Sequence, residues 1–167
     1  IQMARMMSAV ATDAKLVTPR LWKHEPTAPK DLDISRRTLG IVRRALALAV
    51  EDGTARRATR GEFTVAGKTG PAQVYKHSAG IDADDLPKDE RDHAWFVGYS
   101  PTDDPRIAFA IVVEHGGHGG TSAAPIARKV LEVYYDDPPV ESRRTNGLRA
   151  AVVKPTEESN VRPPAPR

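Results

Sequence analysis

Three strand-like segments follow one another in the middle of the chain, and they limit the possible fold more than any other feature. They cover residues 62–75, 93–99 and 106–114. The first alternates around Phe63 and Val65, whereas the third is apolar on both faces, as expected for a strand that is covered on both sides. Because only loops join the three segments, we expect them to pair as antiparallel neighbours in one sheet.

An amphipathic helix is predicted at the start of the chain, over residues 1–12. Two sets of apolar positions have helical spacing: Ile1, Ala4 and Met7, or Met3, Met6 and Val10. A polar connector follows over residues 15–33, and its three prolines prevent a continuous helix. Since the chain begins with Ile1 inside an apparent helix, we expect it to be truncated at the N-terminus.

A second helix is predicted directly after the connector. Ser35 is a suitable N-cap, and Gly53 lies just beyond the expected end of the helix. The expected buried stripe consists of Leu39, Val42, Leu46 and Ala49.

A third helix is predicted after the strands, over residues 123–135, and Pro125 is tolerable in its first turn. The preceding segment 115–120 is too rich in glycine for regular structure. The predicted apolar face of this helix comprises Ile126, Ala127, Val130, Leu131, Val133 and Tyr134. The order of helix, helix, three strands and helix predicts an α+β fold, with an antiparallel sheet of three consecutive strands packed against helices.

The charge of the chain argues against nucleic-acid binding. The formal net charge is +3, but residues 138–167 carry six basic and three acidic residues, so residues 1–137 are neutral. A protein that binds phosphates needs its positive charge on a folded face. Segment 138–167 is also rich in proline and poor in apolar residues, which predicts a disordered tail behind a single domain at 1–137.

The tripeptide Lys68-Thr69-Gly70 is the strongest candidate for chemistry. Side chains alternate along a strand, so Lys68 and Gly70 should share one face while Thr69 takes the other. A lysine can bind a carboxylate or tune a neighbouring hydroxyl, and a glycine inside a strand often marks a close approach to the backbone. The motif K-T-G is one of the signatures of β-lactamases and penicillin-binding proteins. Taken alone, the tripeptide fits a solvated strand edge about equally well.

The surrounding residues resemble one family over nearly the whole chain. Segment 67–74 reads G-K-T-G-P-A-Q-V and is similar to the G-K-T-G-T-A-Q-V strand of class B penicillin-binding proteins. Segments 1–5, 91–101, 111–117 and 123–131 resemble further parts of that family in the same order. The last of them is most similar to penicillin-binding protein 2, of the cell-elongation subclass. The resemblance implies a fold like that of the β-lactamases and transpeptidases.

The resemblance implies a D,D-transpeptidase that binds penicillin and cross-links peptidoglycan stem peptides. In the family, the serine of an S-x-x-K motif attacks the peptide carbonyl, and an S-x-N motif assists proton transfer. Neither motif occurs in this sequence. In the family both precede the segment that residues 1–5 resemble, so the catalytic serine is expected upstream and the chain alone is expected to be inactive.

The resemblance also implies a role for each residue of the tripeptide. Lys68 would contribute positive potential, Thr69 a hydroxyl donor to the terminal carboxylate, and Gly70 room for the acyl chain. Pro71 departs from the family pattern, because it stands where the backbone N–H donates to the oxyanion and proline has no N–H. It would line the substrate site without that donor, unless it simply lies on a strand edge.

Other candidate sites are weaker. The glycines around His115 and His118 leave nothing to hold a metal pair in place, so no metal is expected. Trp95 and Phe96 are more typical of a core than of a stacking platform. Four aspartates in a polar loop lack the spacing of a calcium loop: Asp82, Asp84, Asp85 and Asp89.

A second functional hypothesis is a non-catalytic scaffold of the elongation machinery, indicated by Pro71. By resemblance, the parent protein would be anchored in a bacterial membrane, with its catalytic domain on the extracytoplasmic side. It would act beside a glycan-polymerising membrane partner. The part of the parent outside this chain is expected to supply the helix layer of the sheet, so the chain alone should be poorly soluble.

Overall fold

The computed structural model describes residues 1–22, 27–75 and 85–136. Three helices occur in them: α1 (Gln2–Ala11), α2 (Arg36–Glu51) and α3 (Gly119–Asp136). The three longer strands are β3 (Ala66–Ala72), β4 (His93–Ser100) and β5 (Ile107–Val113). The predicted tail at 138–167 lies outside the described residues. None of the described helices is long and apolar enough to cross a membrane.

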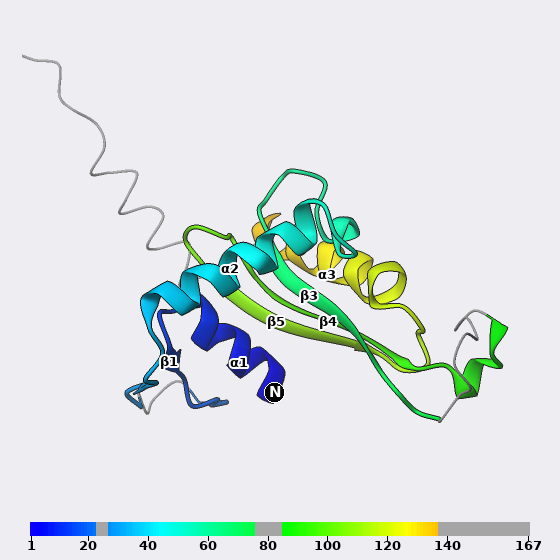
Figure 1. Cartoon of the computed structure of the whole chain (residues 1–167), viewed down its shortest axis with the longest axis horizontal. Coiled ribbons are helices and arrows are strands. Elements are labelled where there is room, and N and C mark those ends of the chain that lie inside the picture. Colours follow the sequence, from blue (N-terminus) through cyan, green and yellow to red (C-terminus); the bar gives the residue numbers. More distant parts are fainter. Residues whose placement is uncertain (23–26, 76–84, 137–167) are drawn as a thin grey trace, which may run out of the picture. The chain divides into compact units, whose positions relative to one another are not determined.

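The three strands form an antiparallel sheet in the order β3–β4–β5. Lys68 lies opposite Val97, and Trp95 lies opposite Val112. Figure 1 shows the three strands side by side, with helices packed around them. The predicted α+β fold and its antiparallel sheet of consecutive strands are therefore confirmed.

The first strand is shorter than predicted, since residues 62–65 and 73–75 lie outside it. Upstream of Ala66 the chain turns, and Gly61 adopts a φ of 102° that favours glycine. Thr64 then bonds to the end of β4 through side chains: its carbonyl accepts a 2.7 Å hydrogen bond from the Ser100 hydroxyl, and its own hydroxyl accepts one from the backbone N–H of Thr102. These hydrogen bonds take the place of the backbone pairing with β4 that would have extended β3 towards the N-terminus.

The connector at 15–33 contains a short antiparallel ribbon that was not predicted. Strand β1 (Lys15–Leu16) pairs with β2 (Lys30–Asp31), and Lys15 forms a 2.8 Å ion pair with Asp31 across it. Two-residue strands carry too little periodicity to be recognised.

One face of the sheet packs against α1. Met7 and Ala11 of the helix form a core cluster with Ala66, Val97 and Tyr99 from the strands. The N-terminal helix is therefore confirmed, with its buried face around Met7 rather than Ile1, which is 86% exposed. Burial raises the pKa of the Tyr99 phenol, and the neighbouring Arg43 guanidinium acts in the opposite direction.

Helix α2 begins where predicted, because the Ser35 hydroxyl accepts a 3.1 Å hydrogen bond from the backbone N–H of Thr38. Its buried face matches the predicted stripe in part, since Leu39 is buried and Leu46 packs against the core cluster. Val42 is exposed, whereas Leu39 and Val50 are buried. Arg43 points inward instead and donates a 2.7 Å hydrogen bond to the carbonyl of Val10 at the end of α1.

Helix α3 begins at Gly119, four residues earlier than predicted, so the glycine-rich segment is partly helical. A Cβ atom on Gly119 would collide with the Trp95 carbonyl oxygen, and one on Gly120 would collide with the carbonyl oxygen of Thr54. Glycine is needed there because the helix start packs directly on other backbone. The low helix propensity of these two glycines is thus outweighed by their packing against the backbone of Trp95 and Thr54.

The start of α3 lies on the face of the sheet opposite α1. Gly119 approaches the Cβ of Thr69, and Thr69 points away from the α1 cluster that contains Ala66. Helices of the chain itself therefore lie on both faces of the sheet, and a further helix layer from the rest of the parent protein stays a prediction.

Two apolar surfaces predicted to be buried are exposed. Val112 of β5 is 47% exposed, because β5 is an edge strand among the described residues. On α3, Ile126 and Val130 are exposed, whereas the smaller Ala123 and Ala127 are buried. The helix thus buries its alanine-rich side, and only half of the predicted broad apolar face is covered.

The close contact at Gly119 predicts a large cost of adding one methyl group. We expect Gly119→Ala to lower the free energy of unfolding by about 2 kcal/mol or more, because the Trp95 carbonyl and helix α3 must move apart to admit the methyl group. Gly40→Ala is the control: Gly40 lies in α2 with no atom within 4 Å of an added Cβ, so this change should stabilise by up to about 1 kcal/mol. Urea denaturation of the protein measures both changes in the free energy of unfolding. Equal effects of the two substitutions would contradict the packing described.

Candidate functional site

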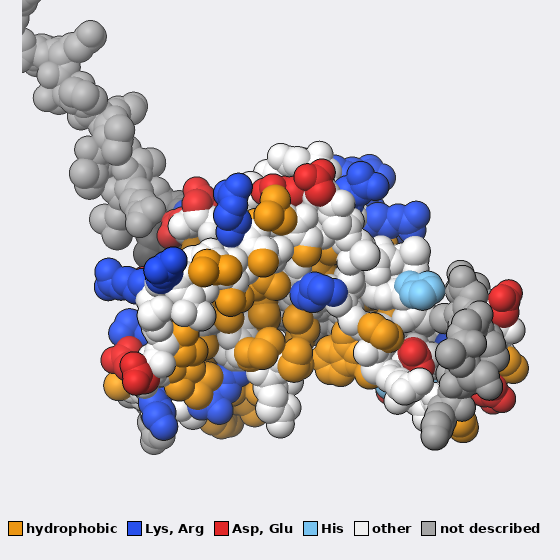
Figure 2. Space-filling view, viewed as in Figure 1, with side chains coloured by type: hydrophobic (Ala, Val, Ile, Leu, Met, Phe, Trp, Pro, Cys, Tyr) orange, Lys and Arg blue, Asp and Glu red, His pale blue; other side chains and the backbone are white. Residues whose placement is uncertain are grey.

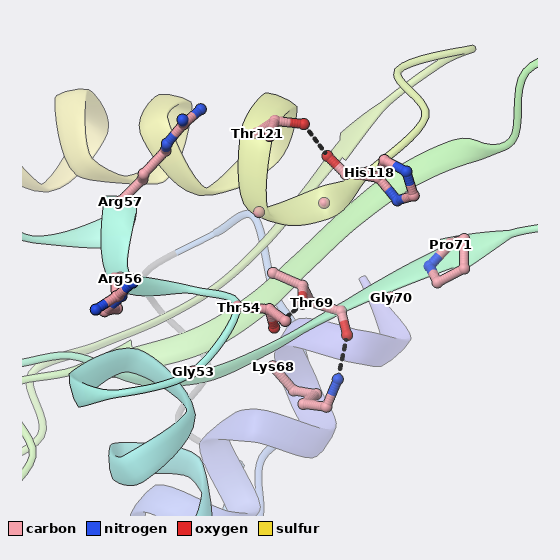
Figure 3. Close-up of a pocket in the computed structure, with 12 residues that line it drawn as sticks. Gly53, Thr54, Arg56, Arg57, Lys68, Thr69, Gly70, Pro71, His118 and Thr121 are labelled. Carbon is pink, nitrogen blue, oxygen red and sulfur yellow. Dashed lines mark hydrogen bonds between the residues drawn. The ribbon is translucent and has the colours of Figure 1, made fainter. Parts of the chain in front are cut away.

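A cavity of about 560 Å³ lies beside β3. Three segments line it: the turn after α2, the middle of β3 and the start of α3. The lining residues are Gly53, Thr54, Arg56, Arg57, Lys68, Thr69, Gly70, Pro71, His118, Gly119, Gly120 and Thr121. Figure 3 shows these segments converging around β3. All four residues predicted to form the site, Lys68 to Pro71, are therefore part of one cavity wall.

The middle of β3 presents Lys68 and Thr69 on opposite sides, as the strand alternation predicts (Figure 3). Lys68 is exposed, and its Nζ donates a 2.8 Å hydrogen bond to the carbonyl of Thr69. Among the described residues its amine has no carboxylate partner. The charge of Lys68 is therefore available to an anion that enters the cavity.

Thr69 is only 8% exposed, and its hydroxyl lies 2.8 Å from the hydroxyl of Thr54. A hydroxyl has one proton to donate and two lone pairs to accept with. If Thr54 donates in this pair, the proton of Thr69 is free to be donated into the cavity. The orientation of the Thr54 hydroxyl can thus decide whether the Thr69 hydroxyl donates a hydrogen bond into the cavity.

Gly70 and Pro71 continue the wall towards solvent. A Cβ on Gly70 would meet no atom within 4 Å, so the glycine leaves open space rather than making room for another part of the described chain. Pro71 is exposed and lies opposite Ala94 in the sheet. Within the described residues β3 pairs with β4 alone, so its other edge has no strand partner.

Among the described residues, the lining of the cavity contains three cationic side chains and no carboxylate. Lys68 comes from β3, whereas Arg56 and Arg57 come from the 3-10 turn η1 (Arg56–Ala58). Such a lining attracts anions and repels cations. Sequence reasoning missed Thr54, Arg56 and Arg57, although the run of basic residues just before β3 was a usable signal.

The residues considered as alternative sites have structural contacts. The backbone N–H of His115 donates a 3.0 Å hydrogen bond to Nδ1 of His93, and the two rings meet edge to face with centroids 4.9 Å apart. His118 instead lines the cavity. Across residues 1–22, 27–75 and 85–136 no three acidic or histidine side chains group as metal ligands.

The aromatic residues of β4 belong to the core, as predicted. Phe96 is fully buried and packs on Phe109, while Trp95 is partly buried against the core cluster. Asp82 and Asp84 lie outside the described residues, so the reading of the aspartates as a solvated face stays a prediction.

Comparison with known proteins gives a consistent result. The family model for the penicillin binding protein transpeptidase domain matches residues 1–132. The peptidoglycan D,D-transpeptidase MrdA of Haemophilus influenzae is 41% identical over 86 residues, which cover 50% of this chain and 13% of the relative. MrdA of Acinetobacter baumannii is 36% identical over 124 residues, which cover 70% of this chain and 18% of that relative.

A solved structure shows the same arrangement in space. The complex between penicillin-binding protein PBP2 and MreC from Helicobacter pylori matches with a TM-score of 0.64 and 30% identity. The match covers 78% of this chain and 24% of that one. The chain thus spans between 13% and 24% of the length of these three relatives.

Proposed function

The chain belongs to the penicillin-binding protein transpeptidase family, and from that premise we propose that it forms one wall of the active-site cleft of a peptidoglycan D,D-transpeptidase. The likeness to PBP2 and MrdA agrees with the elongation subclass that the sequence indicated. The nucleophilic serine belongs, in this proposal, to a part of the protein that precedes Ile1.

One observation carries the proposal: Lys68, Thr69 and Gly70 line a cationic cavity beside an edge of β3 that has no strand partner in the described part of the chain. A peptide that ends in a carboxylate needs a positive charge for that group and a strand edge for its backbone. Lys68 supplies the charge, and β3 supplies the edge. The absence of acidic residues from the lining favours an anionic substrate over a cationic one.

The proposed reaction divides the work between the serine and β3. The serine Oγ attacks the carbonyl between the two terminal D-alanines, an ester to the enzyme forms, and the last D-alanine leaves as the amine. The amine of a neighbouring peptide then attacks the ester and releases the serine. In the first step Lys68 holds the terminal carboxylate, which leaves with the last D-alanine, and the Thr69 hydroxyl donates a hydrogen bond to the same carboxylate. Gly70 leaves space for the acyl chain in both steps.

The cellular setting is proposed by analogy with the relatives. The H. pylori relative is a PBP2 in complex with MreC. We place the full-length protein in a bacterial cell membrane, with this domain on the extracytoplasmic side and a glycan-polymerising partner beside it. Peptidoglycan stem peptides and β-lactams are its proposed ligands, and no nucleic acid is among them.

Covalent labelling by a fluorescent penicillin tests this function in the full-length protein. We expect acylation of the wild type and a decrease of about 10²-fold in the acylation rate constant of Lys68→Ala, because the charge that meets the carboxylate is lost. Lys129→Ala is the control, since Lys129 is an exposed lysine of α3 outside the cavity lining. No labelling of the folded wild type, or equal losses in the two variants, contradicts the proposal.

Pro71 favours a second candidate function, a transpeptidase-like scaffold without catalysis. In the family, the backbone N–H at this position donates a hydrogen bond to the oxyanion. Proline has no backbone N–H, so Pro71 cannot make this bond. We predict that Pro71→Thr raises the acylation rate constant by about 10²-fold, because one missing donor costs that much in such sites. Val74→Thr, an exposed position near the end of the same segment, serves as the control. An unchanged rate in Pro71→Thr removes the idea of a lost donor.

A further inference from the structure

Two of the three cations in the cavity are not needed for a single carboxylate. Arg56 and Arg57 are both exposed at the cavity and stand on a different element from Lys68. Glu51, Asp52 and Glu62 are near in sequence, yet no ion pair joins any of them to either arginine among the described residues. Their guanidinium groups are therefore available to a ligand.

The backbone that carries the two arginines is held firmly. Ala55 and Ala58 are fully buried on either side of them, and the N–H of Ala58 donates a 2.9 Å hydrogen bond to the carbonyl of Ala55. A 3-10 turn has three residues per turn, so burying Ala55 and Ala58 directs the two residues between them outward. Gly120 of α3 packs against the Thr54 carbonyl and fixes the turn against the helix.

Arg57 and Lys68 lie on different sides of β3. In Figure 3 the side chain of Arg57 extends on the side of α3, whereas Lys68 lies across the strand from it. Cations separated in this way suit two anionic groups rather than one. Because a guanidinium can bind a carboxylate through two parallel hydrogen bonds, an arginine pair recognises a carboxylate more selectively than a lysine does.

We propose that Arg56 and Arg57 form a second anion subsite, which selects donor peptides that carry a carboxylate in addition to the terminal one. The inference rests on the proposed function and adds a specificity determinant to it. The terminal carboxylate remains with Lys68 and Thr69, and the second carboxylate lies between η1 and the start of α3. No covalent step involves the arginines, so they act in binding alone.

Two β-lactams that differ by one carboxylate test the subsite in the full-length protein. Carbenicillin is benzylpenicillin with a second carboxylate on its side chain. We expect the double variant Arg56→Gln with Arg57→Gln to lower the ratio of the carbenicillin to the benzylpenicillin acylation rate constants by roughly fivefold, a value typical of a partly exposed ion pair. The effect should shrink at 1 M salt, because screening weakens charge pairs near solvent.

The matched control is Arg36→Gln with Arg37→Gln. These two arginines are also adjacent and exposed, at the start of α2, and they lie outside the cavity lining. The net charge changes equally in both double variants, so a general electrostatic effect would lower both ratios alike. An unchanged ratio in the Arg56 and Arg57 variant, or an equal change in the control, overturns the subsite.

A binding measurement separates this proposal from the proposed function. Two peptides that end in D-Ala-D-Ala, one with a Glu and one with a Gln at an upstream position, are titrated by calorimetry into the full-length protein. Preference for the Glu peptide that is lost in the arginine variant supports the subsite even if penicillin does not acylate the protein. Equal affinity of the wild type for both peptides refutes the subsite even if acylation proceeds.

Discussion

The register between β3 and β4 is the constraint on which the rest of the site depends. Lys68 lies opposite Val97, and Thr69 lies opposite Phe96. Because strand side chains alternate, this pairing sends Lys68 to one side and Thr69 to the other. A slip of one residue would exchange the two and would also turn Ala66 out of the core cluster. The core and the cavity are therefore specified by the same pairing, which sets the side of the strand from which each side chain extends.

The start of α3 completes the cavity by backbone contact rather than by long side chains. Gly119 touches β4 at the Trp95 carbonyl, and Gly120 touches the turn after α2 at the Thr54 carbonyl. The helix thereby brings together β3 and a turn that are separate in sequence, and the Thr54 hydroxyl reaches Thr69. The result is a cavity in which every charged group that the structure describes is cationic. Such a cavity suits the ligand proposed above, whose carboxylate it would attract and whose peptide backbone would lie along the strand edge.

Part of this arrangement could be predicted from the sequence, because it depends on local periodicity. The alternation of Lys68 and Thr69, the cap at Ser35 and the three consecutive strands all follow from patterns a few residues long. The resemblance to class B penicillin-binding proteins placed the same residues in a substrate site, and the family assignment is confirmed.

The remaining features depend on contacts between distant segments, which no local pattern reports. Gly119 and Gly120 are poor helix formers, and only their contacts with Trp95 and Thr54 explain why α3 includes them. Val42 has the spacing of a buried residue, yet Arg43 takes the inward position because it can bond to the Val10 carbonyl. The pairing of Thr54 with Thr69 likewise requires the folded turn after α2.

The central claim is that a ligand binds along the edge of β3 that lacks a strand partner among the residues described. Hydrogen–deuterium exchange of the full-length protein, before and after acylation by benzylpenicillin, tests it directly. We predict slower exchange in peptides that cover residues 68–72 of β3 and unchanged exchange across β5, because new hydrogen bonds form only at the substrate edge. Complete acylation with no change in exchange along β3 would contradict the account.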